Sequence, residues 1–267
     1  RELGIIDINE ERVEGDVLDL TDALSFTYPK KVYKAEYADC KDAEVVVITA
    51  GIPQKPGETR LQLVDKNLVI FKDMIGKVVA SGFDGIFVVA SNPVDVTTYA
   101  TMKYSGFPAN KVIGSGTTLD TSRFKKQIGD LLDVDYRSVH AYIMGEHGDT
   151  EFPVWSNANV GGLSIEEWKS THPNISQESL DAAFDKTVNA AYEIINKKGA
   201  TFYGIGTALS SIVRAILNDE NTVFLTSSYL NGEFGLKDIH IGVPTVIGKS
   251  GVAHIIEVPL SDKEQEQ

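Results

Sequence analysis

Four short segments hold most of the side chains that could take part in a reaction. They are residues 54–60, 91–95, 119–123 and 145–149. The last segment reads Gly-Glu-His-Gly-Asp and contains His147, whose ordinary pKa near neutrality lets its imidazole both accept and donate a proton. A histidine between glycines is also a common loop residue, so His147 alone does not establish a reaction.

Asp120 and Arg123, in the third segment, are three residues apart. In a helix this spacing places both side chains on nearly the same face. A guanidinium there can hold a carboxylate with two parallel hydrogen bonds. Asp120 could instead cap a helix N-terminus, and Arg123 could form an ordinary surface salt bridge. Arg60 ends a segment in which Pro56 and Gly57 exclude regular helix and strand.

The pattern of apolar residues predicts the elements that position these side chains. Continuous apolar runs at residues 3–7, 45–50 and 86–90 are typical of parallel strands covered on both faces. Between the last two, residues 61–80 place their apolar side chains on one helical face. Alternating strands and helices predict a parallel α/β sheet in the first half of the chain.

From about residue 139 the pattern changes. Two long helical stretches, residues 177–197 and 201–217, are followed by a β-rich end at residues 224–258. The chain is therefore expected to have a nucleotide-type first half and a mixed α+β second half. Neither an internal repeat nor a low-complexity linker is evident between them.

Small residues follow several of the predicted strands, at positions 49–51, 90–92 and 114–116. Small residues at the carboxyl ends of parallel strands let a ligand approach the backbone. Asp7 stands where a dinucleotide-binding fold has an acid that holds the ribose hydroxyls. An acid after a strand is often a simple loop residue, and each small group could be a tight turn. Together they predict a nucleotide crevice.

Bulk properties exclude several function classes. The net charge of -13 argues against binding to nucleic acid or to an anionic membrane surface. The single cysteine, Cys40, excludes an internal disulfide and favours a reducing compartment, so we expect a cytoplasmic protein. Apolar runs all fall short of the ~18 residues that a membrane-spanning helix requires.

The four segments, in this order, closely resemble the L-lactate/L-malate dehydrogenase family, its bacterial lactate dehydrogenases above all. The resemblance covers essentially the whole chain. It implies a Rossmann-type NAD-binding domain at residues 1–116, followed by a substrate domain at residues 117–267. The implied reaction is reversible hydride transfer between NADH and pyruvate, giving L-lactate and NAD⁺, without a metal.

The resemblance also implies roles for the reactive residues. His147 would be the acid/base, with Asp120 on its other ring nitrogen, stabilising the imidazolium. Arg123 would hold the substrate carboxylate. Arg60 would lie on a mobile lid whose closure brings a cation to the carbonyl oxygen and excludes water.

Further positions would line the two ligands. By resemblance, Asn92 contacts the carbonyl oxygen and the nicotinamide side, and Thr201 lines the substrate pocket, although either could be an ordinary turn residue. Gln54 would face the group beyond the reacting carbon. Its neutral amide suits pyruvate, because the second carboxylate of oxaloacetate or malate would be left without a cation. The expected cofactor-binding residues are Asp7, Tyr37, Gly51, Ile52, Ser91, Asn92 and Ser115.

Many bacterial members of this family bind fructose 1,6-bisphosphate between the subunits of a homotetramer. The corresponding positions here hold Lys125 and His140. Lysine keeps the positive charge of the family's arginine but lacks its two-pronged hydrogen bonding to phosphate. We therefore expect a homo-oligomer, a tetramer by resemblance, in which activation by this effector is weakened. A plain charged helix surface is the alternative.

The sequence departs from the family's pattern at both ends. The first strand with its glycine-rich turn, and the terminal helix, have no counterpart among the 267 residues. A chain of this length is expected to bind NAD poorly, because helix N-terminus and backbone donors for the pyrophosphate are missing, and it could be an inactive fragment.

Three alternative functions remain open. The chain could prefer malate or another 2-hydroxy acid. An NAD-requiring glycosidase of related fold would need a metal held by cysteine and histidine, but Cys40 lies far in sequence from His147. A non-catalytic protein on the same scaffold would have no reason to keep His147, Asp120, Arg60 and Arg123 together.

Overall fold

The structure is a computed structural model that describes residues 2–28, 30–52, 60–173 and 175–267, and the side chains of all of these but 60–63. The α-helices are α1 (Glu10–Asp22), α2 (Arg60–Ala80), α3 (Val94–Ser105), α4 (Thr118–Leu132), α5 (Ile165–Thr171), α6 (Gln177–Lys198), α7 (Tyr203–Asn218) and α8 (Asp262–Glu266). The strands are β1 (Glu2–Ile5), β2 (Lys31–Lys34), β3 (Val45–Ile48), β4 (Ile86–Val89), β5 (Val112–Gly114), β6 (Val139–His140), β7 (Ile143–Met144), β8 (Phe152–Pro153), β9 (Asn159–Val160), β10 (Leu163–Ser164), β11 (Thr222–Asn231), β12 (Lys237–Gly248) and β13 (Gly251–Ile255).

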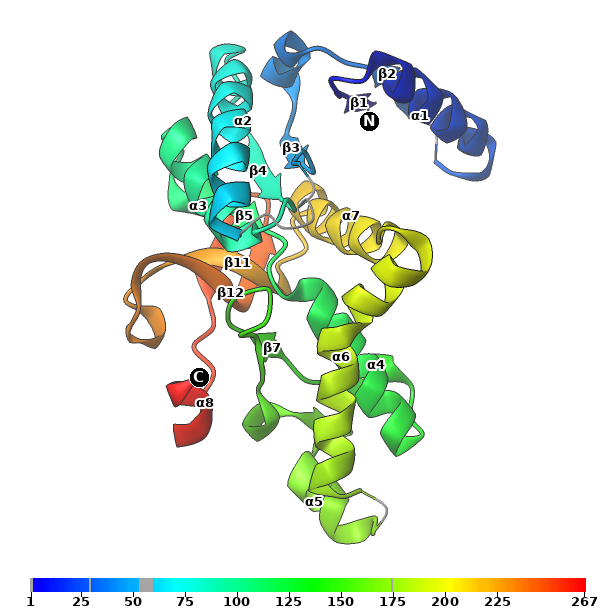
Figure 1. Cartoon of the computed structure of the whole chain (residues 1–267), viewed down its shortest axis with the longest axis vertical. Coiled ribbons are helices and arrows are strands. Elements are labelled where there is room, and N and C mark those ends of the chain that lie inside the picture. The colour runs from blue at the N-terminus through cyan, green and yellow to red at the C-terminus, as the bar shows by residue number, and fades with distance from the viewer. Residues whose placement is uncertain (1, 29, 53–59, 174) are drawn as a thin grey trace.

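A six-stranded sheet in the order β13-β12-β11-β5-β4-β3 carries both halves of the chain (Figure 1). Strands β3, β4 and β5 run parallel, which confirms the α/β sheet predicted from the continuous apolar runs. Both faces are covered. Along β4, Phe87 and Val89 pack towards α2 and α3, whereas Ile86 and Val88 pack towards α7. An apolar run without alternation is what two covered faces require.

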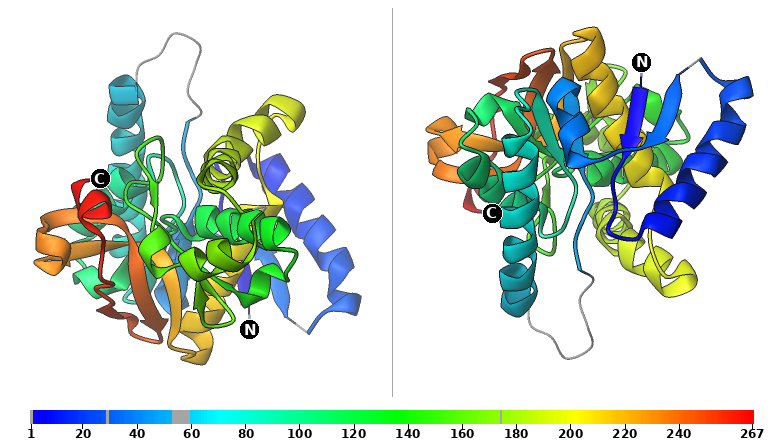
Figure 2. Two further views of the ribbon diagram at one scale, coloured as in Figure 1. Left: turned by 90° about the horizontal axis from the view of Figure 1, so that it is seen from below. Right: turned by 90° about the horizontal axis from the view of Figure 1, so that it is seen from above.

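The parallel sheet predicted for the first half forms in two parts. Strands β1 and β2 pair in parallel, with Leu3 opposite Val32. Within the described residues no ladder joins this pair to β3. Figure 2 shows α1 and the β1–β2 pair (blue) on one side of the molecule and β11–β13 (orange to red) on the other.

The second half adds the antiparallel strands β11, β12 and β13 to the edge formed by β5. The contact runs through Ser227 of β11 opposite Gly114 of β5. A separate apolar cluster fastens α4 to α6, where Phe124 and Ile128 meet Leu180. The helices predicted at 177–197 and 201–217 are confirmed as α6 and α7, each within two residues at either end.

None of the helices in the described part of the chain is both long and apolar enough to cross a membrane.

A histidine is buried in strand β12, with no charged partner among the residues that the structure describes. His240 of β12 is 2% exposed, and its ring lies 5.9 Å from that of Tyr99 and 5.6 Å from that of Tyr229, centroid to centroid. Among the described residues neither ring nitrogen reaches a hydrogen-bond partner. Burial lowers the pKa of His240 to about 4, because an imidazolium without a partner is costly in an apolar environment.

The burial of His240 predicts that the folded protein loses stability at acidic pH. Since the folded-state pKa of His240 lies below the unfolded value, its contribution to stability is present above about pH 6.5 and is lost as the pH falls towards 4. Wild-type protein should lose about 2 kcal/mol more of its unfolding free energy between pH 7 and pH 5 than His240→Phe does. Urea denaturation at the two pH values measures this. Exposed His254 supplies the control, His254→Phe, which should behave as wild type; equal losses in all three proteins would contradict the argument.

Candidate active site

The loop that carries His147 is held against β12 by two glycines. The backbone N–H of Gly145 donates to the carbonyl of Gly242 at 3.1 Å, and the N–H of Gly242 donates back to Gly145 at 3.0 Å. A Cβ at Gly242 would stand 2.8 Å from the Gly145 carbonyl oxygen. Gly145 itself has a φ of 97°, which residues with a side chain rarely adopt. Both positions therefore fix where the loop leaves β7.

Helix α4 is fastened to strand β7 by two threonines that bond Ile143. Buried Thr117 donates its hydroxyl to the carbonyl of Ile143 at 2.6 Å. Thr121 accepts the N–H of Ile143 on its hydroxyl at 3.0 Å. These bonds set the first turn of α4 beside the loop that begins two residues after Ile143.

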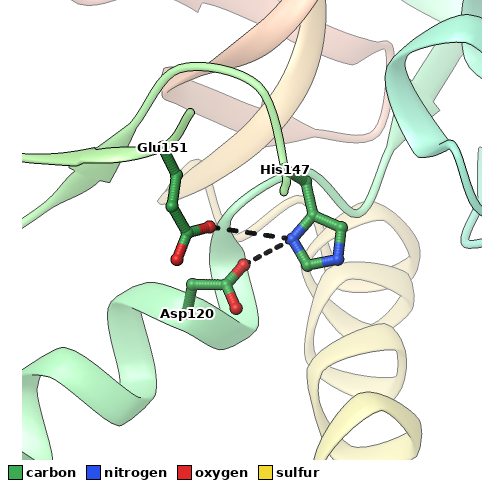
Figure 3. Close-up of side chains that lie close together, drawn as sticks. All are labelled: Asp120, His147 and Glu151. Carbon is green, nitrogen blue, oxygen red and sulfur yellow. Dashed lines mark hydrogen bonds and ion pairs between the residues drawn. The ribbon is translucent and has the colours of Figure 1, made fainter. Parts of the chain in front are cut away.

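As a result, the first turn of α4 faces the histidine (Figure 3). Nδ1 of His147 lies 2.6 Å from Oδ2 of Asp120, and Nη1 of Arg123 donates to Oδ1 of Asp120 at 2.8 Å. The Asp120 side chain is 4% exposed. Asp120 is thus inside α4 and is not its N-cap, a position held by Thr117. Nor is Arg123 in a surface pair, because its side chain is 15% exposed.

The charges of this group shift each other's pKa. Burial raises the pKa of Asp120, but the hydrogen bond and charge of His147, together with Arg123, hold it below its ordinary value. Burial also lowers the pKa of His147, and the Asp120 carboxylate, aided by Glu151 and Asp95, more than offsets this, so the pKa of the imidazole is raised. The Asp120 carboxylate, which has the largest raising effect, therefore stabilises the imidazolium.

Two acids that sequence reasoning did not assign surround the same histidine. Glu151 precedes β8, and its Oε2 lies 4.0 Å from Nδ1 of His147. Asp95, in the first turn of α3, accepts the backbone N–H of His147 at 3.0 Å and the hydroxyl of Ser227. The signal for Asp95 was its place in the 91–95 segment; Glu151 offered only a charge beside the apolar residues that follow it.

Five of the seven residues predicted for the cofactor, namely Gly51, Ile52, Ser91, Asn92 and Ser115, follow β3, β4 and β5. Ser91 is buried and donates its hydroxyl to the carbonyl of Ala50, while the backbone N–H of buried Ser115 donates to Val89 at 2.7 Å. These bonds tie together the three strand ends where a ligand would approach. The peptide bond between Asn92 and Pro93, which follows β4, is cis.

Asn67 of α2 is a further residue that sequence reasoning missed. Its side chain is 1% exposed; it accepts the N–H of Ile52 at 2.9 Å and donates to the carbonyl of Asn92 at 3.4 Å. Asn67 therefore fixes the backbone of two predicted ligand-binding turns, with Gly51 beside it. The sequence signal that could have identified it is a polar asparagine beside the apolar face of the helix predicted at residues 61–80.

Several predicted residues lie in other surroundings. Asp7 follows β1 and accepts the N–H of Asn9, and Tyr37 packs on the apolar cluster of α2. Thr201 is half-buried between α6 and α7. Lys125 is half-buried on α4, where burial lowers its pKa, and His140 of β6 is exposed. Gln54 lies outside the described residues, as does the side chain of Arg60, the first residue of α2.

A cation is a second chemical possibility for the acidic group. One donor atom each of Asp120, His147 and Glu151 lie within 4.8 Å of one another. The Arg123 guanidinium already sits on Asp120, and its permanent positive charge disfavours a metal ion there. The arrangement is better suited to moving a proton at His147 and binding an anion beside Arg123.

Comparison with known sequences gives one family over almost the whole chain. Residues 1–114 match the sequence model of the lactate/malate dehydrogenase NAD binding domain, and residues 117–267 match that of the family's alpha/beta C-terminal domain. L-lactate dehydrogenase of Latilactobacillus sakei is 61% identical over 266 residues, covering 100% of this chain and 82% of the relative. L-lactate dehydrogenase of Lacticaseibacillus casei is 60% identical with the same coverage.

Solved structures agree with this family. The minor L-lactate dehydrogenase of Enterococcus mundtii in its ligands-bound form superposes with a TM-score of 0.96 at 50% identity, covering 100% of this chain and 85% of that one. Its ligands-unbound form gives a TM-score of 0.90 at 48% identity, covering 99% and 84%.

The pairing of Asp120 with His147 predicts a measurable change in the imidazole. In Asp120→Asn the side chain keeps its size but loses its charge, so the pKa of His147 should fall. NMR titration of the ring reports this value directly. Asp130→Asn removes an exposed acid that pairs with Lys126 on the same helix and should leave the pKa unchanged. A His147 titration that is the same in Asp120→Asn and wild type would contradict the pairing.

Proposed function

This chain belongs to the lactate/malate dehydrogenase family, and from that premise we propose that it is an NAD-dependent L-lactate dehydrogenase. The reaction is reversible reduction of pyruvate to L-lactate, the last step of fermentative glycolysis in the cytoplasm. The observation that carries the proposal is the hydrogen bond between His147 and buried Asp120, with Arg123 one turn after Asp120 on the same helix. That arrangement joins a proton donor to a carboxylate-binding cation.

The strand ends fit a dinucleotide. Residues after β3, β4 and β5 are small, and Ser91, Ser115 and Asn67 tie their backbones together. Gly51 and Ile52 are exposed there, where the backbone is open to a ligand. We assign NAD to this edge, with Asp7 on the ribose and Tyr37 as a more distant contact. NADH supplies the hydride when it is bound.

The chain's own residues would bind the substrate and move the proton. Nδ1 of His147 is taken by Asp120, so Nε2, which points away from both acids (Figure 3), is left to face the substrate oxygen. The raised pKa of His147 keeps a proton on Nε2 for delivery to the forming hydroxyl. Arg123 gives one N–H to Asp120 and has others for the pyruvate carboxylate.

The remaining substrate contacts are proposed from the sequence. Arg60 and Asn92 would bind the carbonyl oxygen, and Thr201 would line the pocket. Gln54 would face the methyl group of pyruvate. A neutral amide there leaves a second carboxylate unpaired, which is costly in a closed site.

Substrate preference tests the proposed function. With NADH, purified protein should reduce pyruvate with a kcat/KM about tenfold or more above that for oxaloacetate, since the oxaloacetate carboxylate would lack a cation. Gln54→Arg should shift the ratio towards oxaloacetate, whereas Gln177→Arg, at the start of α6, should not. Faster reduction of oxaloacetate by the wild type would make it a malate dehydrogenase instead. Failure to reduce either acid by protein that binds NADH would overturn the proposal.

We also propose a homo-oligomer, a tetramer, with an effector site at Lys125 and His140. A half-buried lysine offers phosphate a charge but not a planar fork. Fructose 1,6-bisphosphate should therefore stimulate pyruvate reduction weakly, and Lys125→Arg should strengthen the stimulation severalfold. Rates at subsaturating pyruvate, with and without the effector, measure this. The control Lys126→Arg, an exposed neighbour, should respond as wild type; no gain in Lys125→Arg would count against the site.

A further inference from the structure

A second carboxyl group lies beside the proposed acid/base and is not needed to hold it. The Glu151 side chain is 3% exposed, and its Oε2 lies 4.0 Å from Nδ1 of His147, on the side already bonded by Asp120 (Figure 3). Asp120 meets both His147 and Arg123, so its charge is balanced. Glu151 approaches the imidazole too distantly for a hydrogen bond, and acts on it through its charge.

Two carboxyl groups this close do not ionise in the same pH range. Oxygens of Asp120 and Glu151 lie within 4.8 Å of each other and of Nδ1. Asp120 has the two cationic partners and ionises first, so Glu151 keeps its proton at neutral pH. Burial, and next the charge of Asp120, raise the pKa of Glu151 to about 8, while His147 and Arg123 oppose the shift.

Resting on the proposed function, we propose that Glu151 is a positioning residue that extends pyruvate reduction to alkaline pH by becoming negatively charged beside His147. We expect Glu151 to lose its proton before His147 does, because the imidazolium is hydrogen-bonded to the Asp120 carboxylate at 2.6 Å whereas no cation of the described residues is within hydrogen-bond distance of Glu151. The new carboxylate then stabilises the imidazolium 4.0 Å away, so the second proton, the one that His147 delivers, leaves at higher pH. The pair titrates in two linked steps.

The other charges around His147 cannot replace this effect. Burial raises the pKa of Asp95, but hydrogen bonds from the hydroxyl of Ser227 and the backbone N–H of His147 oppose that shift by stabilising its carboxylate. The lowered pKa of Asp120 keeps it ionised throughout the neutral and alkaline range. Arg123 carries a fixed charge. Glu146, on the same loop, is exposed and accepts the hydroxyl of Thr150, so its charge is screened by solvent.

The test compares Glu151→Gln with wild type between pH 6 and 10. Glutamine keeps the shape and the hydrogen bonding of a protonated glutamate but cannot ionise. Its alkaline fall in kcat/KM for pyruvate should begin about one pH unit lower than in wild type. At pH 6.5, where Glu151 is protonated, the two rates should agree within about twofold. Glu151→Asp, which retains a carboxylate, should fall between them, and Glu146→Gln should follow wild type. Coincident alkaline limbs would overturn the proposal.

A second measurement does not depend on turnover. In unmodified protein, the NMR titration of the His147 ring should show two inflections, one of them near pH 8, and the lower one should vanish in Glu151→Gln. A single inflection in the wild-type protein would overturn the role of Glu151. This outcome does not depend on whether Glu151→Gln folds well enough for the activity assay. Two inflections without pyruvate reduction would instead show that Glu151 acts on the charge of His147, and would defeat the proposed function.

Discussion

The site depends on one buried negative charge. Asp120 is almost fully removed from solvent, and it is kept ionised by an imidazole on one oxygen and a guanidinium on the other. Breaking such a pair by removing one partner typically costs about 3–5 kcal/mol, because the remaining charge is stranded. The mutual dependence of the three groups therefore fixes the tautomer of His147, the direction of Nε2 and the place of Arg123 at once.

Holding that charge requires parts of the chain that are far apart in sequence. Thr117 and Thr121 fasten α4 to Ile143, and Gly145 and Gly242 fasten the histidine loop to β12. Asp95 bonds the same loop from α3. Each restraint uses backbone hydrogen bonds or short side chains, which lose little conformational entropy on ordering. Both halves of the chain therefore contribute to placing His147 within hydrogen-bond distance of Asp120.

The strand ends after β3, β4 and β5, where we propose that NAD binds, have a different requirement. Their backbone must stay accessible to the ligand. Gly51 and Ile52 are exposed there, while buried Asn67 satisfies the backbone hydrogen bonds of the turns. A buried amide that hydrogen-bonds two loops holds their backbones in place. The chain thus combines a buried charged group around Asp120 with an accessible backbone at the turn after β3.

The sequence by itself determined the class of fold and the identity of the reactive side chains. Continuous apolar runs specified strands covered on both faces, and the three-residue spacing of Asp120 and Arg123 put them on one helical face, because these periodicities are local properties of the backbone. The pairing of Asp120 with His147 was implied only by the family resemblance, since residue spacing alone left Asp120 as a candidate helix cap. The tertiary structure decided the other pairings, because the sequence patterns assigned no role to Asn67, Asp95 or Glu151. Their roles follow from partners up to 132 residues away, as between Asp95 and Ser227. The raised pKa of Glu151 likewise exists only because folding buries it beside Asp120, since an exposed glutamate in the unfolded chain would be solvated and ordinary.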